Sequence, residues 1–341
     1  AELHSFPGFY FSSPGEQEVN WLDGDVIIFA SLWRSLRKAL IVDIPKRAVE
    51  VASVGTVKGL DEGGVLGDNA EGFSWKVHAS STQDYILAAI GTPNKPDRPV
   101  LGKVSTVNVD NKERRVVEWT AFPITPRHSN HNIKQQRQEV EDWMVGVSWE
   151  ILQVGPSTNS DETHHEGERR PFEAVVVSPP ATATPAPLLV IPHGGPHSCY
   201  AAEFSIRNLY FVSLGYKLLL GNFFFFSFFE VLTIIILVNY RGSLGFGQRA
   251  LNSLPGKCGE QDCADVMDAL KLMVDKGAVG PLAIFGGSHG GFISMYILSV
   301  SLLSIPLSLH SPFLHLSPAS PFLFLSQRSL NLLTFLGAHL L

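Results

Sequence analysis

The chain has 341 residues, of which 45% are hydrophobic and 17% charged, and its formal net charge is −6. This composition is that of a globular protein long enough for two domains, and the negative charge gives no reason to expect nucleic acid or an anionic membrane as a partner. The three cysteines, Cys199, Cys258 and Cys263, form no disulfide framework, and the N-terminus carries no signal peptide, so we expect a cytoplasmic location. The chain begins at Ala1 without an initiator methionine, which suggests a fragment or a processed product.

The pattern of residues 1 to about 155 predicts short strands separated by turns. Val26–Ala30 follows a turn signal at residues 21–25, and the later candidates are Ala39–Ile44, Phe73–Val77, Tyr85–Ile90, Val104–Val109, Val116–Trp119 and Val145–Trp149. These segments are closely spaced and rich in β-branched and aromatic residues, which favours an all-β sandwich, barrel or propeller. The polar stretch Gln135–Asp142 is expected to be a surface connection in preference to a short helix.

The composition changes in the middle of the chain, where polar segments at residues 155–170 and 179–187 flank the strand candidate Ala174–Ser178. We place the domain boundary at these segments. The expected organisation is a first domain over residues 1–170, a linker with a first strand over 171–187, a second domain over 188–298, and a low-complexity tail over 299–341 outside the fold.

From residue 188 onward, apolar strand candidates at 188–191, 237–240 and 281–285 alternate with helical patterns. This alternation predicts a doubly wound, mostly parallel α/β sheet. The clearest helix covers about Glu260–Lys276, and Asp262 and Asp265 fall in its first turns. Acidic side chains there stabilise a helix through its dipole, so we expect helix-start roles for both and not the role of a catalytic acid.

Ser288 lies in the run Gly-Gly-Ser-His-Gly-Gly, between the strand candidate ending at Phe285 and a helical pattern beginning near Phe292. A G-x-S-x-G pattern between a buried strand and a helix is the nucleophile elbow of α/β-hydrolases. Such a serine needs a base and an orienting carboxylate, which follow it in the order acid, then histidine. No aspartate or glutamate follows Ser288. Three histidines in the low-complexity tail have no following acid to orient them and are not assigned as the base: His310, His315 and His339.

Two further loops follow apolar strands and are expected at the same edge of the sheet. The first is Pro192-His193-Gly194-Gly195-Pro196-His197, whose glycines allow backbone N–H groups to approach a developing oxyanion. A second oxyanion donor would be the backbone N–H of His289, the residue after the nucleophile. The other loop is Asn239–Gly247. We expect structural or rim roles for His193 and His197, because both precede the nucleophile in the chain.

The motifs HGGP, NYRGSLGFG and GGSHGG, in this order, resemble the prolyl oligopeptidase family of serine peptidases over residues 188–216 and 238–298, and more weakly over 1–178. The resemblance implies part of a β-propeller followed by an incomplete α/β-hydrolase domain. It also implies release of an N-acylated amino acid from a short blocked peptide, with no metal or cofactor. By position, Ser288 matches the nucleophile, and Gly195 and His289 match the oxyanion donors. The expected partners are short N-acylated peptides, and homo-oligomer formation is left open.

The sequence departs from that family's pattern in three places. Seven propeller blades of about 40 to 50 residues each would need far more chain than precedes the linker. An extra apolar stretch occupies Leu218–Leu237, and the segments carrying the catalytic Asp and His are missing after Leu298. Because Leu218–Leu237 and Ser299–Leu341 are rich in residues with pyrimidine-rich codons, we hypothesise that both are translated noncoding sequence. We therefore expect a chain truncated at both ends and inactive.

Two other classes of function remain open. The chain could be a catalytically dead propeller and hydrolase module that binds peptides, or a carboxylesterase-like lipase with unusual catalytic partners. His164-His165-Glu166 is expected to be a solvated loop and not a metal site, because it lacks helical i, i+4 spacing. Residues 218–238 are nearly long enough to cross a bilayer, but a span there would split the predicted sheet.

Overall fold

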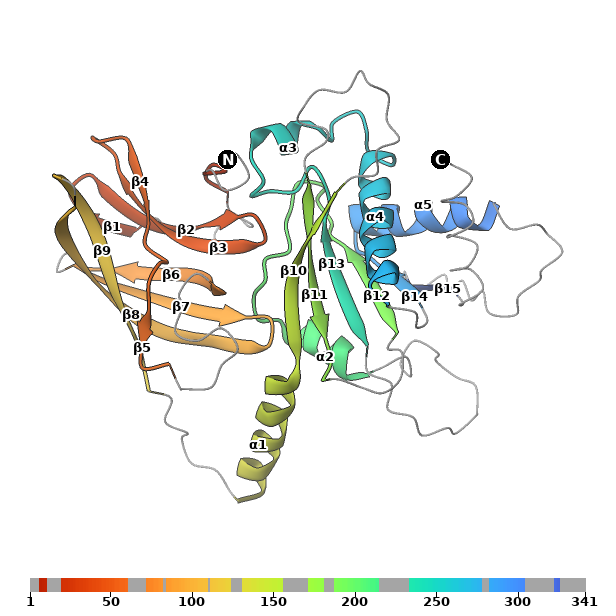
Figure 1. Ribbon diagram of the computed structural model, residues 1–341, viewed down its shortest axis with the longest axis horizontal. Helices are drawn as coiled ribbons and strands as arrows, with labels where there is room; N and C mark the ends of the chain where they lie inside the picture. The colour runs from red at the N-terminus through yellow and green to blue at the C-terminus, as the bar shows by residue number, and fades with distance from the viewer. Residues whose placement is uncertain are drawn as a thin grey trace. The chain divides into compact units, whose positions relative to one another are not determined.

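The structure is a computed structural model that describes residues 6–10, 20–60, 72–81, 84–109, 111–123, 131–155, 171–180, 187–214, 233–277, 282–303 and 322–325. The chain divides into two compact units (Figure 1). The first holds residues 1–146 together with 201–205, and the second holds 147–200 together with 206–341. No helix among the described residues is long and apolar enough to cross a membrane.

The first unit contains two open sheets. One is an antiparallel meander in the order β1-β2-β3-β4: Asn20–Asp23, Val26–Trp33, Leu36–Asp43 and Ala48–Val51. The other has the order β5-β9-β8-β7-β6, with bounds Val57–Lys58, Ser74–Ser80, Tyr85–Thr92, Lys95–Val109 and Lys112–Ala121 for β5 to β9. The described residues between 20 and 121 form strands, as expected for the wider range of residues 1 to about 155, and neither sheet closes on itself.

A pair of tryptophans forms the centre of this unit's core. Trp75 and Trp119 are both fully buried, and their ring centroids lie 4.5 Å apart. The Trp119 indole N–H donates to the Ala52 carbonyl at 2.8 Å, which satisfies its one buried polar atom. Residues 201–205 complete the unit, where Ala202 donates its N–H to the Ser35 carbonyl and its own carbonyl accepts from the Ser74 hydroxyl.

The polar stretch expected as a surface connection is a helix, α1, covering His131–Gly146. That expectation was wrong because local side-chain pairing supports the helix without a large apolar face. Gln135 donates to Glu139 at 3.1 Å and Gln138 to Asp142 at 2.8 Å, both at i, i+4 spacing.

The second unit is built on one six-stranded sheet in the order β10-β11-β13-β12-β14-β15. The strands are Ser148–Val154, Phe172–Ser178, Ile234–Asn239, Leu188–Pro192, Leu282–Phe285 and Phe322–Leu325 in that order. Pairing is parallel only between β12 and its two neighbours, β13 and β14, and the other three pairings are antiparallel. The sheet is therefore mixed, which corrects the expectation of a mostly parallel one.

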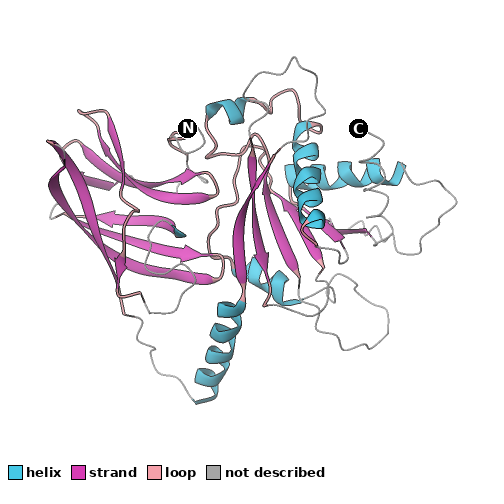
Figure 2. Cartoon of the chain, in the orientation of Figure 1, coloured by secondary structure: helices cyan, strands magenta, loops and turns pink. Residues whose placement is uncertain are grey.

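Helices cover the sheet on both faces (Figure 2). α4 (Gln261–Asp275) and α5 (His289–Leu303) share one buried apolar cluster with alternate strand residues such as Val176, Val190 and Val238. The intervening residues of these strands point to the opposite face, where α2 (Ile206–Leu214) contacts β11 and β13. The short helix α3 (Gln248–Asn252) precedes α4.

The division between the units differs from the expected boundary at residue 170. β10 and β11 pair along their whole length, and Leu152 and Val154 join the core of the second unit, so the division falls at residue 146. After Ser299, α5 continues to Leu303 and β15 pairs with β14, which places these parts of the expected tail within the sheet unit. The rest of the tail, residues 218–232 of the apolar stretch and the 164–166 segment lie outside the described residues.

Candidate active site

Ser288 occupies the sharp turn between β14 and α5. Its φ of 53° lies in the left-handed region, which is strained for a residue with a side chain and is typical of a nucleophile elbow. The turn is close-packed: a Cβ on Gly286 would collide with the backbone of Gly290, and one on Gly290 with the Pro192 carbonyl. Ser288 itself is exposed. The local geometry therefore presents its hydroxyl to solvent at the end of a buried strand.

The loop after β12 lies against this serine. A Cβ on Gly194 would come within 3.3 Å of the Ser288 Cβ and 3.1 Å of the Gly287 carbonyl oxygen. Gly195 follows with a φ of +129°, where a Cβ would come within 2.8 Å of the His197 nitrogen, and the Gly195–Pro196 peptide bond is cis. The structure thus brings the loop of Gly195 and the elbow of Ser288 and His289 together at the carboxyl ends of β12 and β14.

The last residue of β13 and the first residue after it hold that loop in place. The Asn239 side chain makes two hydrogen bonds to the backbone of Tyr200. It accepts from the Tyr200 N–H at 2.7 Å and donates to the Tyr200 carbonyl at 2.8 Å. The Tyr240 hydroxyl lies 3.1 Å from the His193 carbonyl and 3.2 Å from the Pro196 carbonyl, and it donates to this pair. Burial raises the pKa of Tyr240, so its hydroxyl stays protonated and remains a donor.

His193 is a buried structural residue of the same loop. Its Nδ1 lies 2.7 Å from the Gly194 carbonyl and its Nε2 lies 2.7 Å from the Ser243 hydroxyl, and the ring stacks on Tyr240 with centroids 4.3 Å apart. Burial lowers the pKa of His193 to about 4, and the neighbouring His289 and His197 rings lower it further while the Gly194 carbonyl opposes the shift. The Gly194 carbonyl can only accept, so the neutral ring donates to it from Nδ1, and the Ser243 hydroxyl beside Nε2 donates to the Tyr240 carbonyl at 2.6 Å.

Asp265 joins α4 to the loop after β13. Its carboxylate accepts from the Arg241 backbone N–H at 2.7 Å, from Nε at 3.0 Å and from a terminal guanidinium nitrogen at 2.7 Å. Burial raises the pKa of Asp265 to about 6, and the Arg241 guanidinium opposes that shift. The carboxylate is ionised at neutral pH and binds Arg241, which lies 24 positions earlier in the chain. Its role therefore extends beyond stabilising the start of α4.

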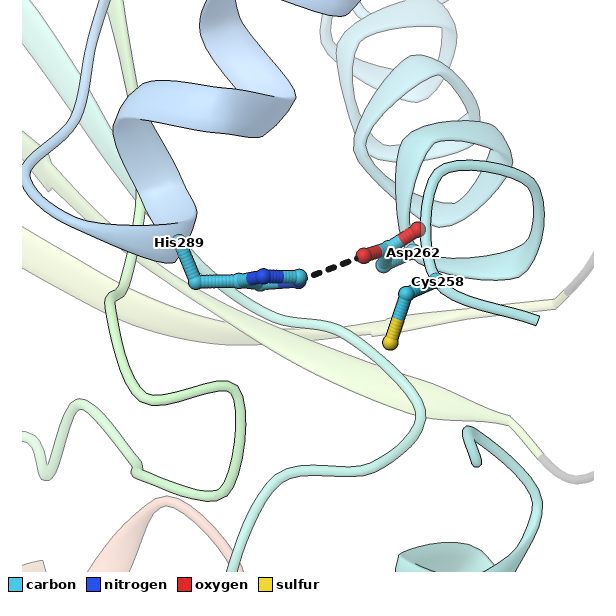
Figure 3. A group of neighbouring side chains, drawn as sticks. All are labelled: Cys258, Asp262 and His289. Atoms are coloured by element: carbon cyan, nitrogen blue, oxygen red, sulfur yellow. Dashed lines mark hydrogen bonds and ion pairs between the residues drawn. The ribbon is translucent and has the colours of Figure 1, made fainter. Parts of the chain in front are cut away.

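Asp262 holds the side chain of His289, the residue that follows Ser288. It is fully buried, and its Oδ1 accepts from the backbone N–H groups of Gly259 at 2.7 Å and Cys263 at 2.9 Å. Its Oδ2 lies 2.6 Å from Nε2 of His289, and the two side chains point toward one another (Figure 3). Sequence reasoning missed this contact, because the residues are 27 positions apart and no local pattern links them.

No described residue supplies a base to Ser288. Within the described ranges nothing is hydrogen-bonded to its hydroxyl, and the His289 imidazole is engaged with Asp262. The histidines considered at positions 310, 315 and 339 lie outside those ranges. The described part of the site therefore comprises Ser288 in its strained turn and a glycine loop.

An exposed serine in a strained strand-to-helix turn, with a glycine loop packed against it, is the arrangement found in serine hydrolases of the acyl-transfer type. The sequence profile of the "Prolyl oligopeptidase family" matches residues 225–301. The chain is 30% identical over 296 residues to "Acylamino-acid-releasing enzyme 1" of Oryza sativa subsp. japonica, covering 86% of this chain and 32% of that enzyme. It is 31% identical over 280 residues to the human "Acylamino-acid-releasing enzyme", covering 81% of this chain and 31% of that enzyme.

The chain is similar to the prolyl oligopeptidase family over residues 225–301, and over more than four fifths of its length it resembles the acylamino-acid-releasing enzymes. It spans about a third of the length of the curated relatives it matches. The fold is similar to that of a crystal structure of puromycin hydrolase, with a TM-score of 0.51 at 16% identity, covering 84% of this chain and 35% of that one.

Proposed function

We propose that this chain carries the nucleophile and oxyanion donors of a peptidase that releases an N-acylated amino acid from a short blocked peptide. The observation that carries the proposal is the left-handed, exposed Ser288 with Gly194 packed beside it. The substrate class is carried over from the acylamino-acid-releasing enzymes, of which this chain covers about a third. No metal or organic cofactor enters the proposed reaction.

In the proposed reaction the Ser288 Oγ attacks the scissile carbonyl, and its proton passes to a base. The negative charge that develops on the carbonyl oxygen is stabilised by the backbone N–H groups of Gly195 and His289. Loss of one such donor typically lowers kcat by about 10²- to 10³-fold. The C–N bond then breaks, the amine takes the proton from the base, and water releases the acyl group from Ser288 in the reverse sequence. Asp262 would support this step by fixing the His289 side chain.

We infer that a polypeptide of this sequence is nearly inactive. No aspartate or glutamate follows Ser288, so no acid stands in the order in which the family places it. Removing a member of a Ser-His-Asp triad typically costs about 10⁴- to 10⁶-fold in kcat. We therefore expect Ser288 to react slowly, at a rate that depends on the fraction of its hydroxyl that is deprotonated.

The first unit is proposed to be part of a β-propeller. Its sheet β1 to β4 is a four-stranded antiparallel meander, which is the topology of a propeller blade. In a complete peptidase of this family, such blades restrict access to the catalytic domain, which would favour short peptides.

Substrate class can be tested through relative acylation rates even when turnover is slow. The full chain is treated with two diphenyl phosphonates, one bearing an acetyl-alanyl group and one a long alkyl chain, and with acetyl-alanine anilide as a substrate. Faster labelling by the acetyl-alanyl reagent, absent in Ser288→Ala, would support the peptidase. Preference for the alkyl reagent would support a lipase. Equal labelling of the wild type and Ser288→Ala would exclude the proposal, and rapid anilide hydrolysis lost in Ser288→Ala would overturn the inferred inactivity.

A further inference from the structure

Three side chains with metal-binding atoms meet where α4 and α5 begin (Figure 3). Cys258 lies in the loop before α4, Asp262 in the first turn of α4, and His289 at the first position of α5. One ligand atom from each residue lies within 4.8 Å of the other two. A thiolate, a carboxylate and an imidazole are all ligands that Zn²⁺ accepts.

The spacing of these atoms is close to what a tetrahedral ion requires. With metal–ligand distances of about 2.0 Å to nitrogen or oxygen and about 2.3 Å to sulfur, ligand atoms lie about 3.3 to 3.6 Å apart. The contact between Asp262 Oδ2 and His289 Nε2 is 2.6 Å and would open by less than about 1 Å. The widest separation in the cluster, at most 4.8 Å, would close by about 1 Å, which a rotation of the exposed Cys258 side chain can supply.

The charge distribution favours a cation at this position. The Asp262 carboxylate is fully buried, and a buried carboxylate is costly unless it is paired or bound to a metal. Its Oδ1 is already held by two backbone N–H groups, so Oδ2 is directed toward the cluster in a fixed orientation. An ion bound there would take the place of the proton that Asp262 and His289 share.

The cluster is also accessible and incompletely coordinated. Cys258 is exposed and the His289 side chain is 14% exposed, so an ion can reach the site from solvent. Three protein ligands leave a fourth position for water. A mixed sulfur, nitrogen and oxygen set disfavours Mg²⁺ and Ca²⁺, which require oxygen ligands, and favours borderline-soft ions.

We propose that Cys258, Asp262 and His289 form a Zn²⁺-binding site. The bound ion would link the loop before α4 to the first residue of α5, directly beside Ser288. The proposal concerns binding alone and stands whether or not Ser288 is reactive.

The full chain, reduced and metal-free, is titrated with Co²⁺ as a spectroscopic substitute for Zn²⁺. We expect one equivalent to bind, with a thiolate-to-cobalt charge-transfer band that Zn²⁺ then removes. Cys258→Ser should abolish the band, and His289→Gln should weaken binding at least about tenfold. Cys199→Ser, which changes a cysteine outside the cluster, is the matched control and should keep the band.

Protection from alkylation provides a second measurement that needs no variant. Zn²⁺ should slow iodoacetamide modification of Cys258 and leave that of Cys199 unchanged, as followed by peptide mass spectrometry. The proposal is overturned if no saturable thiolate band forms, if Cys258→Ser binds Co²⁺ as the wild type does, or if Zn²⁺ fails to protect Cys258. If His289→Gln does not fold, the exposed Cys258→Ser variant and the protection measurement still decide.

Discussion

Gly194 leaves no room for a side chain beside Ser288: a Cβ added to Gly194 would lie 3.3 Å from the Ser288 Cβ. This separation is tighter than ordinary van der Waals contact, so a larger residue at position 194 would require Ser288 or the loop to shift by a few tenths of an ångström. The relationship explains why two glycines stand in the loop. Gly195 requires its left-handed backbone, and Gly194 requires the absence of a side chain.

Gly194→Val should lower the rate of Ser288 acylation by about tenfold or more, because small displacements of a reacting group cost large factors in rate. We also expect a loss in the free energy of unfolding, because Gly194 is half-buried and a Cβ there would lie 3.1 Å from the Gly287 carbonyl oxygen. Fluorophosphonate labelling rates and urea titrations measure the two effects. An unchanged labelling rate would show that the loop moves aside freely.

Asp262→Asn should destabilise the chain by about 1.5 to 3 kcal/mol, because it removes the charge from a buried acceptor of three hydrogen bonds. The matched control is Asp275→Asn at the other end of α4, where an exposed i, i+4 pair with Lys271 is broken. That change should cost no more than about 0.5 kcal/mol. Urea unfolding compares the two variants, and equal losses would contradict the structural role of Asp262.

Arg241→Met should cost about 3 to 5 kcal/mol in the free energy of unfolding, because it leaves the Asp265 carboxylate buried without its partner. The double variant Arg241→Met, Asp265→Leu should recover part of this loss, since it removes the stranded charge. Urea titration of the two variants checks the expectation. If the double variant is no more stable than the single one, the hydrogen bond from the Arg241 backbone N–H to Asp265 contributes more to stability than the ion pair does.

His193 should make stability depend on pH. Its folded-state pKa of about 4 lies below the ordinary value of 6.5, so the unfolded chain binds more protons between these values. The stability contributed by neutral His193 is complete above about pH 6.5 and is lost as the pH falls toward 4, by up to about 3 kcal/mol. Thermal unfolding of the wild type and His193→Gln across this window tests the effect. The variant should be less stable at pH 7 but show a flatter pH dependence, and parallel curves would contradict it.

The elbow and its flanking elements could be predicted from the sequence because their signals are local. The glycines around Ser288, the apolar run of β14 and the strand preceding the Gly194 loop are each specified by a few consecutive residues. No local sequence signal specifies how strands that are distant in the chain pair with one another. β11 lies antiparallel to β13 and β15 to β14, and nothing within these short apolar runs specifies the direction of the partner.

The contacts that organise the site could not be predicted from local sequence patterns. Asp262 and Asp265 both fit the pattern of helix-start residues, yet their side chains bind His289 and Arg241, 27 and 24 positions away. The Tyr240 hydroxyl likewise bonds to carbonyls more than 40 positions earlier in the chain. Such contacts depend on how the strands assemble at their carboxyl ends, which only the folded chain displays.

We propose that Ser288 is an acyl-transfer nucleophile to which no described residue supplies a base, and the pH dependence of its covalent labelling tests this most directly. The full chain is labelled with a fluorophosphonate from about pH 6 to 9, and the adduct is located by mass spectrometry. We predict an adduct at Ser288 alone, absent in Ser288→Ala, forming slowly at a rate that rises about tenfold per pH unit without a plateau. Rapid labelling that levels off near neutral pH, or an adduct at another residue, would contradict the account.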